Sequence, residues 1–367
     1  MKTIADELKS LTSIPALSGL EDTMVREMVQ HFQPLADSVE VDRIGNVTAT
    51  FKGSDEEHEP SLLVFAHMDE LGLMIRRIEP NGYLRFDRVG GVPEKTLMGQ
   101  YVDVFTIDGK NHVVGQIGTH SHHFTPPDAK LNVPTYDKMY IDIGAVTAEE
   151  VKAQGINTGS AVTYHPHFER IGAHLVSSKT LDNRVGCLML IALAEYLHEH
   201  KPAGTVYVVA SVQEEFNIRG VMPVFTRLEP DAAICLDITP ACDTPDLNGK
   251  YDMKLNGGPA ITQMNFHGRG TLAGLIPNPH LRLFMENTLD EMGIPWQRDM
   301  AIGVITDDAF TLMSGTQGTA MAHLSIPMRY SHSPIETCDL RDIEAGIMAL
   351  DTIVSKFDHK LDLRRGV

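Results

Sequence analysis

The chain has 367 residues, a hydrophobic fraction of 43% and a formal net charge of −18. This length exceeds what one hydrophobic core comfortably serves and predicts two domains. The negative charge argues against a partner that is held through its phosphates, so we expect no nucleic acid. The longest clean apolar run, residues 187–194, is far shorter than the roughly 20 residues that cross a bilayer, so we expect no membrane contact either.

The first buried strand of the sequence leads directly into polar residues. Residues 3–33 predict two amphipathic helices, and residues 39–51 predict a hairpin. Residues 61–66, SLLVFA, are apolar without alternation, which is typical of a parallel strand covered on both faces. His67 and Asp69 follow at once. An aspartate two residues beyond a ligating histidine can accept the other ring N–H, so Asp69 is a candidate for orienting His67.

The texture of the sequence changes after this strand. Residues 71–168 contain short strand patterns, many glycines and little helical periodicity. We interpret residues 69–168 as a small β-rich domain inserted into an α/β domain made of residues 1–68 and 169–367. The fold expected for the larger domain is a central mixed, largely parallel sheet flanked by helices.

Three further carboxylates follow where the pattern of alternating helices and strands returns. Asp182 stands at or near the N-cap of an apolar helix predicted over residues 183–198. Residues 206–210 predict another buried strand, and Glu214 and Glu215 lie just past its carboxyl end, at the rim where open α/β sheets bind ligands.

A single site can use both glutamates only if the backbone turns there, because consecutive strand side chains point to opposite faces. Asn217 and Gly220 supply the chemistry of such a turn. Farther on, Asp237 follows a short strand at residues 231–236, and His332 lies in a polar turn after a strand at residues 323–326. Helices are expected over residues 281–292 and 340–357.

Several strand exits and one helix start thus deliver histidine, aspartate or glutamate to one rim. The candidates are His67, Asp182, Glu214, Glu215, Asp237 and His332. Two imidazoles and three carboxylates are too many ligands for one tetrahedral zinc ion. Two ions that share one bridging carboxylate fit better, and one glutamate is then left over as general base.

The stretches around these residues resemble the motif series of the M42 family of metallo-aminopeptidases. They are AHMDELGLMI, KTLDNRVGC, VQEEFNIRG, CLDITPACDTP and RYSHSPIE, in the family's order and across essentially the whole chain. The resemblance implies that Asp182 bridges two metal ions, that His67 and Asp237 complete one site, and that Glu215 and His332 complete the other.

The catalytic residues implied by the resemblance are Glu214, as general base, and Asp69, as the residue that orients His67. The resemblance also implies a PDZ-like insertion that serves dimerisation or oligomerisation, and assembly into homo-oligomers up to a tetrahedral dodecamer. The ligand types favour two zinc ions per subunit and admit cobalt or manganese.

The function expected from these features is removal of the N-terminal residue from short peptides. Two alternatives stay open at this point: a metal-dependent deacylase or carboxypeptidase acting on small amides, and a non-catalytic metal-binding assembly protein. The chain departs from the family motifs at residues 216–218 and 305–309, which leaves the preferred N-terminal residue open. The four cysteines form no CxxC pair, and Cys187, in a helix pattern, and Cys235, in a strand pattern, are expected to be reduced core thiols of a cytoplasmic protein.

Overall fold

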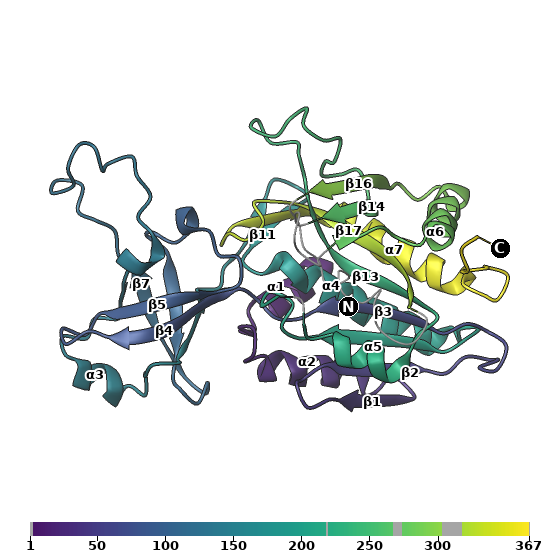
Figure 1. The fold of residues 1–367 in the computed structure, drawn as a ribbon, viewed down its shortest axis with the longest axis horizontal. Helices are drawn as coiled ribbons and strands as arrows, with labels where there is room; N and C mark the ends of the chain where they lie inside the picture. Colours follow the sequence, from purple (N-terminus) through teal and green to yellow (C-terminus); the bar gives the residue numbers. More distant parts are fainter. Residues whose placement is uncertain (1–2, 218, 267–273, 303–317, 367) are drawn as a thin grey trace.

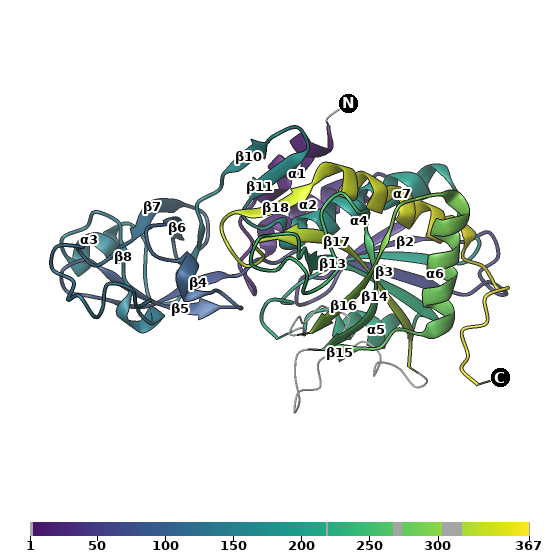
Figure 2. The same ribbon diagram turned by 90° about the horizontal axis from the view of Figure 1, so that it is seen from above.

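The computed structural model describes residues 3–217, 219–266, 274–302 and 318–366. These residues form a mixed α/β part, built on a twelve-stranded sheet, and a closed six-stranded barrel. The barrel stands to one side of the sheet in Figure 1, and the view from above in Figure 2 shows the same separation. The chain enters the barrel directly after β3 (Leu62–His67), so the carboxyl end of this strand faces the barrel.

The α/β part contains most of the helices and strands. Its helices are α1 (Ile4–Thr12), α2 (Asp22–Phe32), α4 (Leu181–Glu199), α5 (Met222–Leu228), α6 (Pro279–Met292) and α7 (Leu340–Lys356). Its strands besides β3 are β1 (Ser38–Val41), β2 (Val47–Phe51), β10 (Phe168–Ile171), β11 (Leu175–Ser178), β12 (Val206–Ser211), β13 (Ala232–Pro240), β14 (Ala260–Phe266), β15 (Gly274–Leu275), β16 (Gln297–Ile302), β17 (Ala320–Arg329) and β18 (Glu336–Asp339). Within the described ranges, every helix is too short or too polar to cross a membrane.

Four neighbouring strands at the centre of the sheet run parallel. The order along the main path is β1-β2-β12-β3-β13-β17-β18-β11-β10. Strands β12, β3, β13 and β17 are paired in parallel with their neighbours in this row, whereas the flanking strands β2 and β18 are antiparallel to it. The sheet is therefore mixed with a parallel centre, as predicted, and the carboxyl ends of four strands meet at one rim.

Both faces of the central strands are covered, which explains their lack of alternation. Every residue of β3 is buried. Leu62 and Val64 belong to the core formed with α1, α2, α4, α6 and α7, whereas Leu63 and Phe65 belong to the core formed with α5. Phe65 packs edge to face on Phe225 of α5, with ring centroids 5.3 Å apart.

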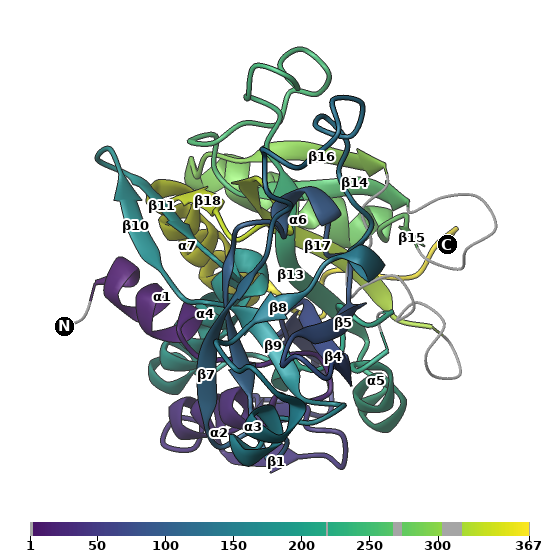
Figure 3. The ribbon, with the colours of Figure 1, turned by 90° about the vertical axis from the view of Figure 1, so that its left-hand side faces the viewer.

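The inserted part is a closed barrel with the strand order β4-β5-β8-β7-β6-β9. Its elements are β4 (Gly72–Ile78), β5 (Leu84–Val89), the 3₁₀ turn η1 (Glu94–Thr96), β6 (Tyr101–Phe105), β7 (His112–Ile117), the 3₁₀ turn η2 (Tyr136–Lys138), β8 (Ile141–Asp142), α3 (Ala148–Ala153) and β9 (Ala161–Tyr164). It has a hydrophobic core of its own, which includes Phe86, Val104 and Ile141. Figure 3 shows the barrel in front of the sheet. The PDZ-like classification of the insertion stays a prediction.

Two strand boundaries differ from those expected from the sequence. The strand expected to end before Asp237 continues to Pro240, because β13 stays paired with β17 as far as Pro240 and Met328. The strand expected at residues 323–326 correspondingly runs over ten residues in β17. Asp237 therefore lies inside a strand, and its neighbours on both sides are fixed by backbone pairing.

Candidate metal centre

Strands β3 and β13 part at the level where two predicted ligands stand. Their recorded pairing ends at Phe65 and Cys235, and the same register continued by two residues brings His67 level with Asp237. On the other side of β3, the register places Ser211 beside His67. The side chains of His67 and Asp237 approach each other in the opening between β3 and β13, and His67 Nε2 lies 3.9 Å from an oxygen of Asp237.

Asp182 lies between the two predicted histidines. Its Oδ1 is 3.2 Å from His67 Nε2, and its Oδ2 is 3.6 Å from His332 Nε2. Glu215 lies on the side of His332, with an oxygen 3.8 Å from the same Nε2. One carboxylate therefore has an oxygen directed to each of two His-containing groups, one with Asp237 and one with Glu215.

His332 is oriented by a carbonyl from the inserted barrel. Its Nδ1 lies 3.0 Å from the backbone oxygen of Gly91, so the ring donates its Nδ1–H there and leaves Nε2 unprotonated in the neutral form. A Cβ added at Gly91 would lie 2.9 Å from the same Nδ1, and only glycine therefore permits this approach. The barrel thus contributes to the site through the loop after β5.

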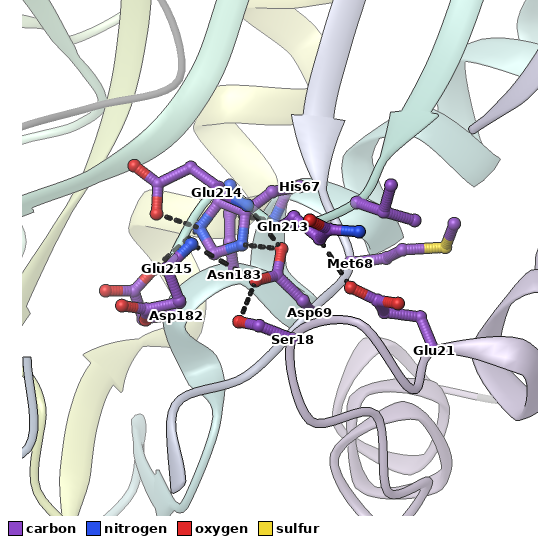
Figure 4. A network of polar contacts seen from close by, with 12 residues as sticks. Ser18, Glu21, His67, Met68, Asp69, Asp182, Asn183, Gln213, Glu214 and Glu215 are labelled. Atoms are coloured by element: carbon purple, nitrogen blue, oxygen red, sulfur yellow. Dashed lines mark hydrogen bonds and ion pairs between the residues drawn. The ribbon is translucent and has the colours of Figure 1, made fainter. Parts of the chain in front are cut away.

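Asp69 holds the segment that carries both glutamates (Figure 4). Its two oxygens accept the backbone N–H groups of Glu214 and Glu215 at 3.0 and 3.1 Å, and Ser18 donates its hydroxyl at 2.5 Å. The distance from Asp69 to His67 Nδ1 is 3.4 Å, which suits an ion pair and is long for a hydrogen bond. Burial raises the pKa of Asp69, but the contacts from His67, Ser18 and Glu214 outweigh burial and lower it.

The backbone turns earlier than the sequence indicated. Asn217 has a φ of +69° as expected of a turn residue, but Gln213 already has a φ of +56°, before the two glutamates. Glu21 accepts the N–H of Gln213 at 3.1 Å. Burial and the nearby Asp69 raise the pKa of Glu21 to about 7. Two buried carboxylates thus take three consecutive N–H groups of the glutamate segment.

The start of α4 forms hydrogen bonds with β13 and with the residue that follows β3. Asp182 and Asn183 have non-helical backbone angles, and the N-cap position is Thr180 rather than Asp182. Asn183 donates its side-chain amide to Leu236 O at 2.9 Å, directly before Asp237. The buried guanidinium of Arg184 donates to the carbonyl of Met68, which lies between His67 and Asp69.

A fully buried ion pair lies beneath this segment. Lys179 Nζ is 2.5 Å from Glu70 Oε2, and both side chains are 2% exposed. Thr180 donates its hydroxyl to the same oxygen at 2.9 Å, and Ala16 donates its N–H to the other oxygen at 2.9 Å. Glu70 therefore joins the end of β3, the N-terminal loop and the start of α4.

Asp237 also borders a second buried polar group. Ligand atoms of Asp237, Cys235 and His323 lie within 4.8 Å of one another. His323 Nδ1 is 2.8 Å from the hydroxyl of Thr262, which lies 3.3 Å from Asp299. The polar environment of the candidate centre thus continues behind Asp237, toward the neighbouring strands.

The ionisation of the site reflects concentrated negative charge. Burial raises the pKa of Glu215 to about 7, against the opposing effect of His332, and Asp182 raises it further. Burial alone would lower the pKa of both imidazoles. The carboxylates of Glu214 and Asp182 nevertheless raise the pKa of His67, and those of Glu215 and Asp182 raise the pKa of His332. A buried group of this charge favours bound protons or bound cations.

The geometry fits divalent metal ions. Two ligands about 2.1 Å from a tetrahedral ion lie about 3.4 Å apart. The separations of His67 and His332 from the surrounding carboxylates, 3.2 to 3.9 Å, are close to this value. Both Nε2 atoms point to carboxylates while each Nδ1 faces an oxygen, which is the arrangement that orients ligating histidines.

All six residues predicted for the rim thus lie together, and Asp69 lies beneath them. Their individual roles as metal ligands or general base stay a prediction. Residues 305–309, where the chain departs from the family motifs, lie outside the described residues, as does residue 218.

Three residues of the site were not predicted from the sequence: Glu21, Gly91 and Glu336. Glu336 accepts the N–H groups of Asp182 and His332. The adjacent motifs SGLE and SHSPIE were the available signals.

Known proteins are similar to this chain in sequence and in fold. The family model described as M42 glutamyl aminopeptidase matches residues 45–348. A protein of Escherichia coli (strain K12) named "Putative aminopeptidase SgcX" is 44% identical, with 96% of this chain and 93% of the relative covered. A solved structure of the aminopeptidase APDkam598 from the archaeon Desulfurococcus kamchatkensis has a TM-score of 0.91 at 33% identity and covers 99% of this chain and 98% of its own.

A second solved structure adds information on assembly. The TET1 peptidase of Pyrococcus horikoshii has a TM-score of 0.85 at 29% identity, with 96% of this chain and 100% of TET1 covered, and it is described as able to assemble into a tetrahedron or a large octahedral shell. The matches extend over both the sheet and the inserted barrel. This chain therefore belongs to the M42 glutamyl aminopeptidase family, whose members are metal-dependent hydrolases of peptide bonds.

Proposed function

We propose that this chain removes the N-terminal residue from short peptides with the help of two divalent metal ions. The observation that carries the proposal is the position of Asp182, with one oxygen 3.2 Å from His67 Nε2 and the other 3.6 Å from His332 Nε2. A carboxylate in this position suits a bridge between two ions, which in paired sites lie about 3.5–4 Å apart.

The proposed ligands form two groups that share Asp182. His67 and Asp237 would complete one site, and Glu215 and His332 would complete the other. Bound metal ions at such a site polarise the carbonyl of the scissile bond and lower the pKa of water. Zinc suits this mixture of imidazole and carboxylate ligands, and cobalt or manganese are also compatible.

Glu214 is proposed as the general base. One of its oxygens lies 3.9 Å from His67 Nε2, at the edge of the proposed centre, and its backbone N–H is fixed by Asp69. From there the carboxylate takes a proton from the attacking water and delivers it to the leaving amine nitrogen. Asp69 acts as a positioning residue, because it holds His67 and the backbone of both glutamates.

The adjacent glutamates provide a matched test of this division of labour. Glu214→Gln should abolish peptide hydrolysis and keep the full metal content, because it changes the base and no proposed ligand. Glu215→Gln should lose metal from one site. Metal content by mass spectrometry and turnover of dipeptides would be measured for both variants. Full turnover in Glu214→Gln, or metal loss in Glu214→Gln but not in Glu215→Gln, would reject the assignment.

The bond that is cleaved can be tested directly on the intact chain. Peptides with a free amino terminus, the same peptides with an N-acetyl group, and small acylated amines would be compared in metal-replete buffer. An aminopeptidase cleaves the first set. Preference for the blocked amino terminus would replace this proposal with a deacylase, and absence of any hydrolysis would leave metal binding as the function.

We also propose that the barrel mediates assembly into homo-oligomers, from dimers to a tetrahedral dodecamer. The fold-level similarity to TET1, which extends over the barrel, supports this. Light scattering on the purified chain would measure the particle mass, and a monomer at micromolar concentration would contradict the proposal.

We further propose that the protein is located in the cytoplasm. The four cysteines all lie in described segments, are buried, and none is in a disulfide.

A further inference from the structure

The turn that carries His332 has an unusual backbone. Tyr330 and His332, neither of them glycine, have φ values of +61° and +63° in the left-handed region. Such residues persist where surrounding contacts fix them, and they cluster at functional sites. Within the turn, Ser333 donates its hydroxyl to the carbonyl of Tyr330 at 2.6 Å and accepts the N–H of Ile335 at 3.2 Å. The turn therefore folds back and brings the first residue of β18 beside His332.

That first residue is Glu336, and its side chain reaches two site residues at once. Its Oε1 accepts the backbone N–H of His332 at 2.9 Å, and its Oε2 accepts the backbone N–H of Asp182 at 3.1 Å. The side chain is buried, with 2% of the residue exposed. In the antiparallel pair of β11 and β18, Glu336 lies opposite Ser178, four residues before Asp182, which explains how it reaches the start of α4.

The same arrangement occurs on the other side of the site. Asp69 uses its two oxygens for the backbone N–H groups of Glu214 and Glu215. Each of two buried carboxylates thus holds a pair of main-chain N–H groups, and each pair belongs to residues whose side chains converge on the centre. Glu336 differs in that its two partners come from distant segments, the start of α4 and the turn after β17.

We propose that Glu336 is a positioning residue that sets the distance between Asp182 and His332, and thereby the geometry of the metal site formed with Glu215. The inference rests on the proposed function only in so far as that site binds a divalent cation. Partners behind the ligands of a metal site typically change metal affinity by about 10- to 100-fold when they are removed.

Glutamine is the informative substitution because it keeps the shape of the side chain. Both partners of Glu336 are N–H donors, so both of its oxygens act as acceptors. A glutamine has one acceptor oxygen, and its NH₂ group would face the second donor. Glu336→Gln therefore breaks one of the two contacts without removing buried volume. Glu344→Gln, on the exposed side of α7, is the matched control.

The test measures metal binding without substrate. Metal-free wild type, Glu336→Gln and Glu344→Gln would be titrated with Co²⁺ by calorimetry, and the visible spectrum of each bound ion would be recorded. We expect one of the two ions to bind about 10- to 100-fold more weakly to Glu336→Gln, with an altered spectrum. The control should be unchanged, and the ion held with Glu215 and His332 should lose more affinity than the ion held with His67 and Asp237, because only the former site depends on both contacts of Glu336. Raised metal concentration should restore occupancy, which would not follow from a general loss of folding.

Unchanged affinity and spectrum for both ions in Glu336→Gln would overturn the inference. If that variant does not fold, Glu336→Asp decides, because a side chain one methylene shorter cannot reach both N–H groups; wild-type metal affinity in Glu336→Asp would also overturn it. Failure of the proposed function looks different. A wild-type chain that binds two ions but cleaves no peptide would refute the aminopeptidase and leave the role of Glu336 intact.

Discussion

Gly91→Ala tests whether the inserted barrel helps to build the metal centre. The added Cβ would lie 2.9 Å from His332 Nδ1 and 3.0 Å from Cε1. Gly91 does not have a left-handed φ, so alanine introduces contact without backbone strain. Ordinary carbon contacts begin near 3.5 Å, so the imidazole would have to retreat by about 0.5 Å.

The size of the effect follows from what this retreat disrupts. The hydrogen bond from His332 Nδ1 to the carbonyl oxygen of Gly91, which spans 3.0 Å, would lengthen or break. Loss of the partner that orients a ligating histidine weakens metal binding about 10- to 100-fold, or roughly 1.4 to 2.7 kcal/mol. We therefore expect one of two ions to bind more weakly by that amount, and turnover to fall at limiting metal concentration.

The control is a glycine of the same barrel with a comparable close approach. A Cβ at Gly115 would lie 2.9 Å from Ile141 Cγ2. Gly115 belongs to strand β7 of the barrel and is distant in sequence from every proposed ligand. Gly115→Ala should lower the stability of the barrel and leave metal affinity unchanged in a calorimetric titration. Wild-type metal affinity in Gly91→Ala, or equal losses in both variants, would refute the reasoning.

Two further predictions concern buried charges outside the centre. Burial raises the pKa of Asp351 to about 7, so the folded state holds its proton to higher pH than the unfolded state, and stability is lost as pH rises from about 4 to 7. Asp351→Asn should therefore raise the free energy of unfolding at pH 8 by about 1 kcal/mol, after allowance for solvent screening, with a gain that vanishes toward pH 4 in denaturant titrations. Lys179→Met would leave Glu70 buried without its cation, and should lower the free energy of unfolding by about 3–5 kcal/mol in the same titrations. A decrease of less than about 1 kcal/mol would show that the ion pair does not stabilise the fold.

Much of the site followed from the sequence because it depends on strands. Residues 61–66 and 206–210 are apolar without alternation, and such strands must lie inside a covered sheet. Parallel strands bring their carboxyl ends to one rim, which accounts for the convergence of His67, Glu215 and Asp237. The resemblance to a family then supplied the pairing of these residues with Asp182 and His332.

The remaining contacts depend on how separate segments pack, which a sequence pattern does not express. Gly91 and His332 are 241 residues apart in the sequence, and they come into contact because the loop after β5 of the barrel lies against the rim of the sheet. Glu336 reaches Asp182 through an antiparallel register that no local periodicity indicates. The early turn at Gln213 is held by Glu21 rather than by a turn residue of its own.

The central claim is that Asp182 lies between two metal ions. Crystals of the chain loaded with zinc, measured with X-rays on either side of the zinc absorption edge, would locate the ions directly. The account predicts two anomalous peaks about 3.5–4 Å apart, one on each side of the Asp182 carboxylate. A single peak, or two peaks that leave Asp182 without a metal contact, would contradict it.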